Sequence, residues 1–261
     1  MSPERPLVLV GSGNMGGAML EGWLAAGRDK AAIIIVDPAA KIAPDGVRVE
    51  PAPPDVTAHT VVMAVKPQMM ADVMPAAAKM CDARTMILSV AAGIKVDRLA
   101  TMGGGPVVRT IPNTPASIGK GATAAFAYRA SAEDRAFAED LLSAIGETQW
   151  VEDEALIDAA TAVSGSGPAY VFHMVEAMAA AGEAEGLPPD VAAALARQTI
   201  VGAGALLERS ELDPATLRSN VTSKGGTTAA ALSVLMGEDR LTRLMTEAVA
   251  AAAHRSRELG S

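Results

Sequence analysis

The sequence of 261 residues is poor in aromatic side chains, cysteine and positive charge. Phenylalanine, tyrosine and tryptophan make up 3% of the residues, too few for a surface on which nucleic-acid bases stack. Lys and Arg number 22 against 30 Asp and Glu, and this net charge of −8 argues against nucleic acid as a partner. The one cysteine, Cys81, excludes an internal disulfide and a cysteine-built metal cluster, and we expect no metal site.

Long apolar runs are also missing. The longest stretch without Asp, Glu, Lys or Arg, residues 159–175, contains two glycines and a proline and is shorter than the ~20 apolar residues of a membrane span. The apolar residues 7–10 end at a glycine and are too short for a secretory signal. Half of the residues are hydrophobic, which excludes a disordered chain. We therefore expect a soluble, cytoplasmic protein with no membrane partner.

The first half of the sequence alternates strand-like and helix-like segments. Short apolar runs typical of strands buried on both faces occur at 7–10, 33–36, 60–65, 85–90 and 107–110, with a sixth candidate at 122–128. Helices are expected at 14–26, 68–80 and 131–145, the last one capped by Ser131. This alternation predicts an α/β fold with a doubly wound parallel sheet.

The second half of the sequence has helical patterns only. Helices are expected at 168–185, 189–209 and 241–259. We place a domain boundary near residue 152, between an α/β domain (1–152) and an all-helical domain (153–261). A helical segment of ~110 residues rich in alanine has a thin core of its own. Self-association through this half, as a homodimer, is therefore expected to bury more apolar surface.

A glycine-rich loop follows the first expected strand. Residues 11–17, Gly-Ser-Gly-Asn-Met-Gly-Gly, contain the pattern GxGxxG between a strand and a helix. Gly11 permits the tight turn, Gly13 lets the backbone approach a pyrophosphate, and Gly16 lets the helix pack close to the strand. The phosphate is expected at the helix N-terminus, where free N–H groups favour an anion. The pattern predicts a dinucleotide site; the alternative is a glycine-rich turn that binds nothing.

An acidic residue ends the second expected strand. Asp37 follows Gly16 by 21 residues, where an acid bonds the adenosine ribose hydroxyls of a dinucleotide. Its charge repels a 2′-phosphate, so the sequence favours NADH over NADPH. The alternative is that Asp37 only caps a turn before Pro38.

Two segments of the helical half are too rich in glycine and hydroxyl groups for plain helix. They are residues 162–170, Ala-Val-Ser-Gly-Ser-Gly-Pro-Ala-Tyr, and residues 221–228, Val-Thr-Ser-Lys-Gly-Gly-Thr-Thr. Each precedes an expected helix, where backbone N–H groups and hydroxyls suit a small carboxylate. Two flexible interhelical loops are the alternative.

With these motifs in their order, the sequence resembles the pyrroline-5-carboxylate reductase family from about residue 7 to residue 250. The resemblance rests on GSGNMGGA at 11–18, AVKP at 64–67, RTIPNTP at 109–115, AVSGSGPAY at 162–170 and VTSKGGTT at 221–228. It implies an N-terminal Rossmann-type domain and a C-terminal helical domain that forms a homodimer or a multiple of dimers. It also implies an active site where the cofactor meets the two helical-domain loops. The implied reaction is the reduction of the cyclic imine 1-pyrroline-5-carboxylate to L-proline by NADPH or NADH.

The resemblance also assigns site residues. The expected cofactor-binding residues are Gly11, Ser12, Gly13, Asn14, Met15, Gly16, Asp37, Ala64, Val65, Lys66, Pro67, Ala91 and Ala92. The expected substrate-binding residues are Ser164, Gly165, Ser166, Gly167, Gly225, Gly226, Thr227 and Thr228. Thr228 matches a threonine proposed to hydrogen-bond the imine nitrogen and is the expected catalytic residue.

The sequence departs from the family pattern at three places. Ile111 stands where methionine is common, Lys224 stands where proline is common, and residues 51–54 replace a segment that often carries a ribose-binding asparagine. The last departure, together with Asp37, leaves the choice between NADH and NADPH open.

Other functions stay open at this point. A β-hydroxyacid dehydrogenase shares the N-terminal motif but needs a helix lysine, and the expected helix 168–185 contains none. A non-catalytic dinucleotide sensor and a reductase of six-membered imines are further alternatives. His59 precedes an expected strand, His173 lies inside an expected helix and His254 lies near the end of the sequence, so each is interpreted as structural or solvated. This agrees with the chemistry, since a protonated cyclic imine accepts hydride without a strong general acid.

Overall fold

The computed structural model describes residues 1–40, 44 and 46–260, which form two compact units. The first unit contains residues 1–166 and the described residues from 252 onward, and the second contains residues 167–251. The expected domain boundary lay near residue 152, whereas the first unit continues to Ser166. The cause is a short helix after the sheet, α5 (Leu156–Ala160), whose Ile157 is buried with Ile111 and Ala124 of the sheet. The division into a dinucleotide-binding domain, 1–152, and a substrate-binding and dimerisation domain, 153–261, stays a prediction.

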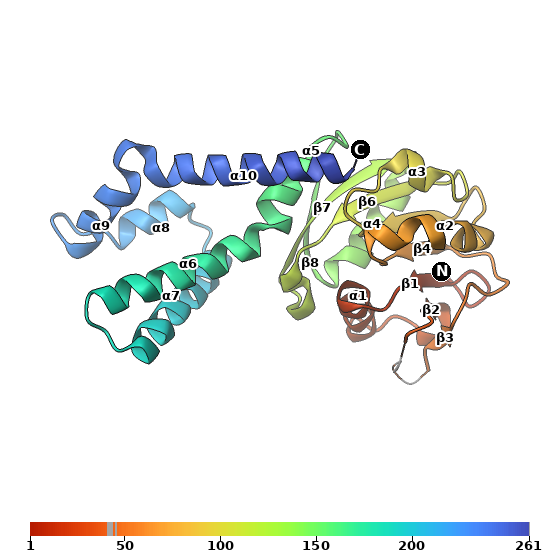
Figure 1. Ribbon diagram of the computed structural model, residues 1–261. Helices are drawn as coiled ribbons and strands as arrows, with labels where there is room; N and C mark the ends of the chain where they lie inside the picture. Colours follow the sequence, from red (N-terminus) through yellow and green to blue (C-terminus); the bar gives the residue numbers. More distant parts are fainter. Residues whose placement is uncertain (41–43, 45, 261) are drawn as a thin grey trace. The chain divides into compact units, whose positions relative to one another are not determined.

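The first unit is built on a single eight-stranded sheet with the order β3-β2-β1-β4-β5-β6-β7-β8 (Figure 1). The strands are β1 (Leu7–Val10), β2 (Ile33–Val36), β3 (Arg48–Glu50), β4 (Thr60–Met63), β5 (Met86–Ser89), β6 (Val107–Ile111), β7 (Gly121–Tyr128) and β8 (Gly146–Trp150). The six strands from β3 to β6 are parallel, which confirms the doubly wound α/β fold. β7 runs antiparallel to β6, and β8 is parallel to β7.

Helices cover both faces of the sheet, which explains why its central strands are apolar throughout. They are α1 (Asn14–Ala25), α2 (Met70–Ala77), α3 (Val96–Ala100) and α4 (Ala132–Ser143), with short 3-10 turns at Lys30–Ala32, Pro67–Met69, Ala78–Met80 and Thr114–Ile118. Trp23 of α1 and Leu141 of α4 belong to the core on one face, and Met70 of α2 and Leu99 of α3 to the core on the other. Alternate residues along β1 enter the two cores, as the pleat of a strand requires.

Two helical expectations need correction. The segment expected as one helix at 68–80 consists of α2 with a 3-10 turn at each end; Pro67 is the first residue of the first turn, and Pro75 lies inside α2 without a backbone N–H to donate. Residues 162–165, expected as part of a loop, lie in a π-helix, η5 (Thr161–Gly165), which follows α5 directly. In contrast, the cap of α4 is confirmed, since Ser131 and Asp134 form a reciprocal capping box.

The second unit is helical, as expected. It contains α6 (Gly167–Ala184), α7 (Pro189–Arg209), α8 (Pro214–Asn220), α9 (Thr227–Met236), a 3-10 turn (Gly237–Asp239) and most of α10 (Arg240–Leu259). α6 and α7 pack side by side (Figure 1). Large apolar side chains are nevertheless exposed along them, among them Phe172 and Leu195. By length and composition alone α7 is apolar enough to cross a membrane, but a helix covered by protein passes the same test.

Candidate functional site

A cleft of about 490 Å³ opens at the carboxyl ends of β1, β2 and β4. In a doubly wound sheet, ligands bind at this edge. The lining includes Gly11 and Gly13 after β1, Asp37 after β2, and residues 64–66 after β4. Residues 51–53 line the same cleft, although only their departure from the family pattern had connected them with the cofactor.

The three glycines of the GxGxxG pattern have distinct structural roles. Gly11 adopts φ +93°, and its N–H donates to the carbonyl of Val36 at 3.0 Å, which joins the loop to β2. A Cβ atom at Gly16 would overlap the carbonyl oxygen of Gly11, so only glycine lets α1 start this close to the loop. Among the described residues, a Cβ atom at Gly13 would meet no atom within 4 Å. Gly13 therefore leaves open space in the cleft where a pyrophosphate is expected.

The N-terminus of α1 faces the same space. Gly13 is its N-cap residue and supplies no side-chain hydrogen bond. The first N–H groups of a helix have no partner within the helix, so those at the start of α1 suit a phosphate. Asn14 and Met15 lie in this first turn. The residues present thus fit the dinucleotide that the glycine pattern predicts.

Asp37 is tied to the glycine loop. Its Oδ2 accepts the backbone N–H of Ser12 at 2.8 Å and the hydroxyl of Ser12 at 2.7 Å. Its Oδ1 accepts the N–H of Ala39 at 2.8 Å, so it also caps the turn before the next segment. Burial would raise the pKa of Asp37, but these hydrogen bonds outweigh burial and hold the pKa below its ordinary value. The cleft therefore carries a fixed negative charge after β2 at neutral pH.

The other expected cofactor residues are divided between the cleft and its surroundings. Lys66 is exposed at the cleft, and the N–H of Ala64 donates to the carbonyl of Val10 at 2.8 Å. Ala92 and Pro67 line a neighbouring depression of about 520 Å³ instead. Ala91 is buried in the hydrophobic core.

The expected substrate residues fall in both units. Ser164, Gly165 and Ser166 belong to the first unit, at the end of the π-helix and immediately after it. The others belong to the second unit, where Gly167 begins α6 and Gly226 is the N-cap residue of α9. Thr227 and Thr228 form the first turn of α9, and Gly225 adopts φ +71° before it.

Two residues of the segment 109–115 have contacts that the motif alone did not reveal. Arg109 pairs with Glu154, and the side chain of Asn113 bonds both Ser164 and Ala122. Arg109 lies in the middle of β6 and Asn113 lies two residues after its end, so the sequence signal for both was a polar residue within or next to an apolar strand.

The parallel sheet, the glycine loop at its carboxyl edge and the open N-terminus of α1 define a Rossmann-type dinucleotide-binding protein. A family model described as "NADP oxidoreductase coenzyme F420-dependent" matches residues 6–93, and one described as "Pyrroline-5-carboxylate reductase dimerisation" matches residues 154–259. The pyrroline-5-carboxylate reductase of Pseudomonas aeruginosa is 42% identical over 99% of this chain and 98% of its own. That of Haemophilus influenzae is 38% identical over 98% of each chain. The chain belongs to the pyrroline-5-carboxylate reductase family.

Solved structures agree with this assignment. A pyrroline-5-carboxylate reductase from Coxiella burnetii matches with a TM-score of 0.89 and 31% identity over 99% of both chains. A pyrroline carboxylate reductase from Plasmodium falciparum, solved with NADP bound, matches with a TM-score of 0.77 and 26% identity over 100% of both chains. Membership of this family supports the NAD(P)H-dependent reduction of 1-pyrroline-5-carboxylate to L-proline as the activity of the chain. The dehydrogenase and sensor alternatives are not favoured.

Proposed function

We propose that the chain reduces 1-pyrroline-5-carboxylate with NADH in preference to NADPH, and that the cleft beside Gly13 holds the dinucleotide. The observation that carries the preference is the carboxylate of Asp37, which two hydrogen bonds from Ser12 fix beside the glycine loop. An acid at this position accepts the ribose hydroxyls of NADH. It repels the 2′-phosphate of NADPH, which is the kind of repulsive element on which specificity often depends.

For the cofactor, the backbone of residues 11–16 would hold the pyrophosphate, and residues 64–67 and 91–92 would border the nicotinamide half. When bound, the reduced nicotinamide supplies the hydride for the imine carbon. Lys66 adds a positive charge at the cleft, opposite in sign to the pyrophosphate. We thus attribute the cofactor preference to Asp37, beside the adenosine ribose. The pyrophosphate contacts do not contribute to it, because NADH and NADPH share them.

For the substrate, we assign the carboxylate to the segments Ser164–Gly167 and Gly225–Thr227. Both lie at or before the first turn of a helix, where N–H groups without helical partners favour an anion. The Thr228 hydroxyl would accept a hydrogen bond from the protonated imine nitrogen and so orient the C=N bond. Because this imine is already a good electrophile, the chain needs no strong general acid. The five-membered ring is the proposed substrate, over a six-membered one.

Self-association belongs to the same proposal. The family model that matches residues 154–259 is named for dimerisation, and Phe172, Leu195 and other apolar side chains of the second unit are exposed. We infer a homodimer, or a multiple of dimers, that covers these side chains and works in the cytoplasm. Sedimentation at micromolar concentration tests this inference, and a monomer would contradict it.

The cofactor preference is tested by steady-state oxidation of NADH and NADPH with fresh pyrroline-5-carboxylate. We expect a higher kcat/KM with NADH for the unmodified chain. Asp37→Ser should move the ratio toward NADPH by about ten-fold, the effect of removing one like charge a few ångströms from a phosphate. Ser12→Ala is the matched control, because it removes one hydrogen bond to Asp37 and keeps the charge. A preference for NADPH, or a ratio that Asp37→Ser leaves unchanged, would overturn the NADH proposal.

The role of Thr228 needs a separate comparison. Thr228→Val removes the hydroxyl and should lower kcat by roughly 10- to 100-fold, the value of one hydrogen bond to a charged group. Thr228→Ser keeps the hydroxyl and should retain most of the activity. Equal losses in both variants would contradict the imine contact.

A further inference from the structure

The junction between the π-helix η5 and α6 contains a backbone carbonyl that lacks its usual helical partner. In an α-helix the carbonyl of residue 164 would accept the N–H of residue 168, but that residue is Pro168, which has no N–H. The preceding turn is widened as well, because the N–H of Ser166 donates to the carbonyl of Thr161 at 2.9 Å, five residues back. π-turns of this kind occur frequently at functional sites.

Asn113 satisfies that carbonyl. Its Nδ2 donates to the carbonyl oxygen of Ser164 at 2.9 Å, and its Oδ1 accepts the backbone N–H of Ala122 at 2.9 Å. Only 9% of Asn113 is exposed, so water does not compete strongly for these bonds. An asparagine amide both donates and accepts, whereas an aspartate only accepts when ionised. The residue thus connects the π-helix to the start of β7.

The neighbouring packing restricts the same turn. A Cβ atom at Gly165 would lie 3.4 Å from the side chain of Ile111 and 3.4 Å from that of Thr161. Ile111 is 5% exposed and lies two residues before Asn113. Ile111, the last residue of β6, therefore packs against Gly165, and Asn113, in the loop after β6, bonds Ser164. Together they hold the turn in place.

We propose that Asn113 is a positioning residue for the substrate. By fixing the Ser164 carbonyl it sets the direction of the peptide that follows, and with it the positions of Gly165 and Ser166. This inference rests on the proposed function, in which residues 164–167 receive the substrate carboxylate. Asn113 touches neither substrate nor cofactor and acts through the backbone of Ser164.

The test compares Asn113→Ala, Asn113→Asp and the double variant Asn113→Ala with Pro168→Ala in the full-length chain. We expect KM for pyrroline-5-carboxylate to rise about ten-fold in both single variants, the equivalent of one buried hydrogen bond, with little change in kcat. The Kd for NADH should stay unchanged. Pro168→Ala restores an N–H four residues after Ser164, so the double variant should recover much of the lost substrate affinity.

Thr85→Val is the matched control. It removes a buried hydroxyl that lies within hydrogen-bond distance of both the Ala58 carbonyl, at 2.9 Å, and Asp82 Oδ1, at 3.0 Å, at the amino ends of the strands. It should lower Tm without raising KM. The proposal is overturned if folded Asn113 variants keep the KM of the unmodified chain, if Thr85→Val raises KM equally, or if Pro168→Ala restores nothing. Absence of turnover in the unmodified chain would contradict the proposed function instead.

Discussion

Arg109 and Glu154 form an ion pair in the first unit, with 2.7 Å between the guanidinium and the carboxylate. The Arg109 side chain is 4% exposed and that of Glu154 is 23% exposed. The same Glu154 oxygen also accepts the N–H of Val96 at 2.9 Å, so the carboxylate joins β6 to the first turn of α3. Glu154, which follows the last strand of the sheet, is therefore held to β6 by a guanidinium group that water hardly reaches.

Glu154→Ala should lower the free energy of unfolding by about 3 kcal/mol, because it leaves a buried guanidinium without its partner. The matched control is Glu152→Ala, since Glu152 pairs with Arg135 at 3.3 Å and its side chain is 83% exposed. That exposed pair is expected to contribute at most about 1 kcal/mol. Urea unfolding at one fixed protein concentration measures both, and equal losses would contradict the distinction.

Gly13→Ser should separate cofactor binding from stability. A Cβ atom at this position meets no atom of the described residues within 4 Å, and a serine at the N-cap of α1 gains a few tenths of a kcal/mol for the free protein. The same side chain takes the space assigned to the pyrophosphate, so the Kd for NADH should rise by at least about ten-fold. Fluorescence titration gives the Kd, and thermal unfolding without cofactor gives Tm. An unchanged Kd would place the pyrophosphate elsewhere.

Gly16→Ala should instead act on the fold. Its Cβ would overlap the carbonyl oxygen of Gly11, so α1 must move, at a cost of roughly 1–3 kcal/mol. Gly17→Ala is the adjacent control, because a Cβ there would lie 3.6 Å from the carbonyl oxygen of Ser12, an ordinary contact. We expect a lower Tm for the first variant and an equal or higher Tm for the second, since alanine favours helix over glycine. A lower Tm for Gly17→Ala than for Gly16→Ala would refute the close approach of α1 to the Gly11 carbonyl.

The strands that the sequence predicted most clearly are those whose side chains are buried on both faces of the sheet. β1, β2, β4, β5 and β6 are buried on both faces, so each is a continuous apolar run that stands out without any alignment. β8 alternates partly buried and exposed positions and contains Glu147 and Gln149, so no apolar run marks it. β3 is a three-residue edge strand with the same difficulty. The reversed direction of β7 follows from a connection to β6 that contains one 3-10 turn and no crossover helix.

The site was predictable where one local pattern determines the geometry. Gly11, Gly13 and Gly16 lie within six residues, and their backbone roles follow from their spacing. The bond from Asn113 to Ser164 joins residues 51 positions apart, and no local pattern encodes such a contact. Pro168 was visible in the sequence, but its consequence for the Ser164 carbonyl required knowing that the preceding residues are helical.

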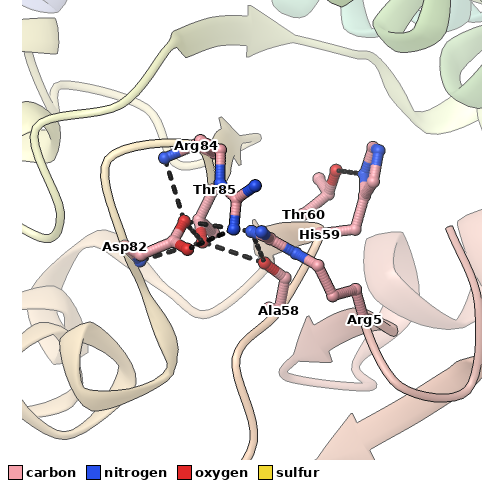
Figure 2. A network of polar contacts seen from close by, with 7 residues as sticks. All are labelled: Arg5, Ala58, His59, Thr60, Asp82, Arg84 and Thr85. Carbon is pink, nitrogen blue, oxygen red and sulfur yellow. Dashed lines mark hydrogen bonds and ion pairs between the residues drawn. The ribbon is translucent and has the colours of Figure 1, made fainter.

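The acid sensitivity of the first unit should depend on Asp82 (Figure 2). Burial would raise the pKa of Asp82, but hydrogen bonds from the Arg84 N–H, Arg5 and Thr85, together with the charge of Arg5, lower it to about 2. A depressed folded-state pKa contributes stability that is fully present above the ordinary value and is lost as pH falls through the folded value. Asp82→Asn should therefore lower Tm at neutral pH, and the difference from the unmodified chain should disappear between about pH 4 and about pH 2.

Arg5→Met is the control that identifies the cause of this depressed pKa. Arg5 lies 3.0 Å from the Asp82 carboxylate and also donates to the carbonyl of Ala58 at 3.0 Å. Without this partner the pKa of Asp82 should rise toward its ordinary value. The stability contribution of Asp82, measured by repeating Asp82→Asn in the Arg5→Met background, should then be smaller and should disappear at a higher pH. If thermal unfolding across this range shows the same pH window in both backgrounds, Arg5 does not cause the shift, and the hydrogen bonds from Arg84 and Thr85 alone must account for it.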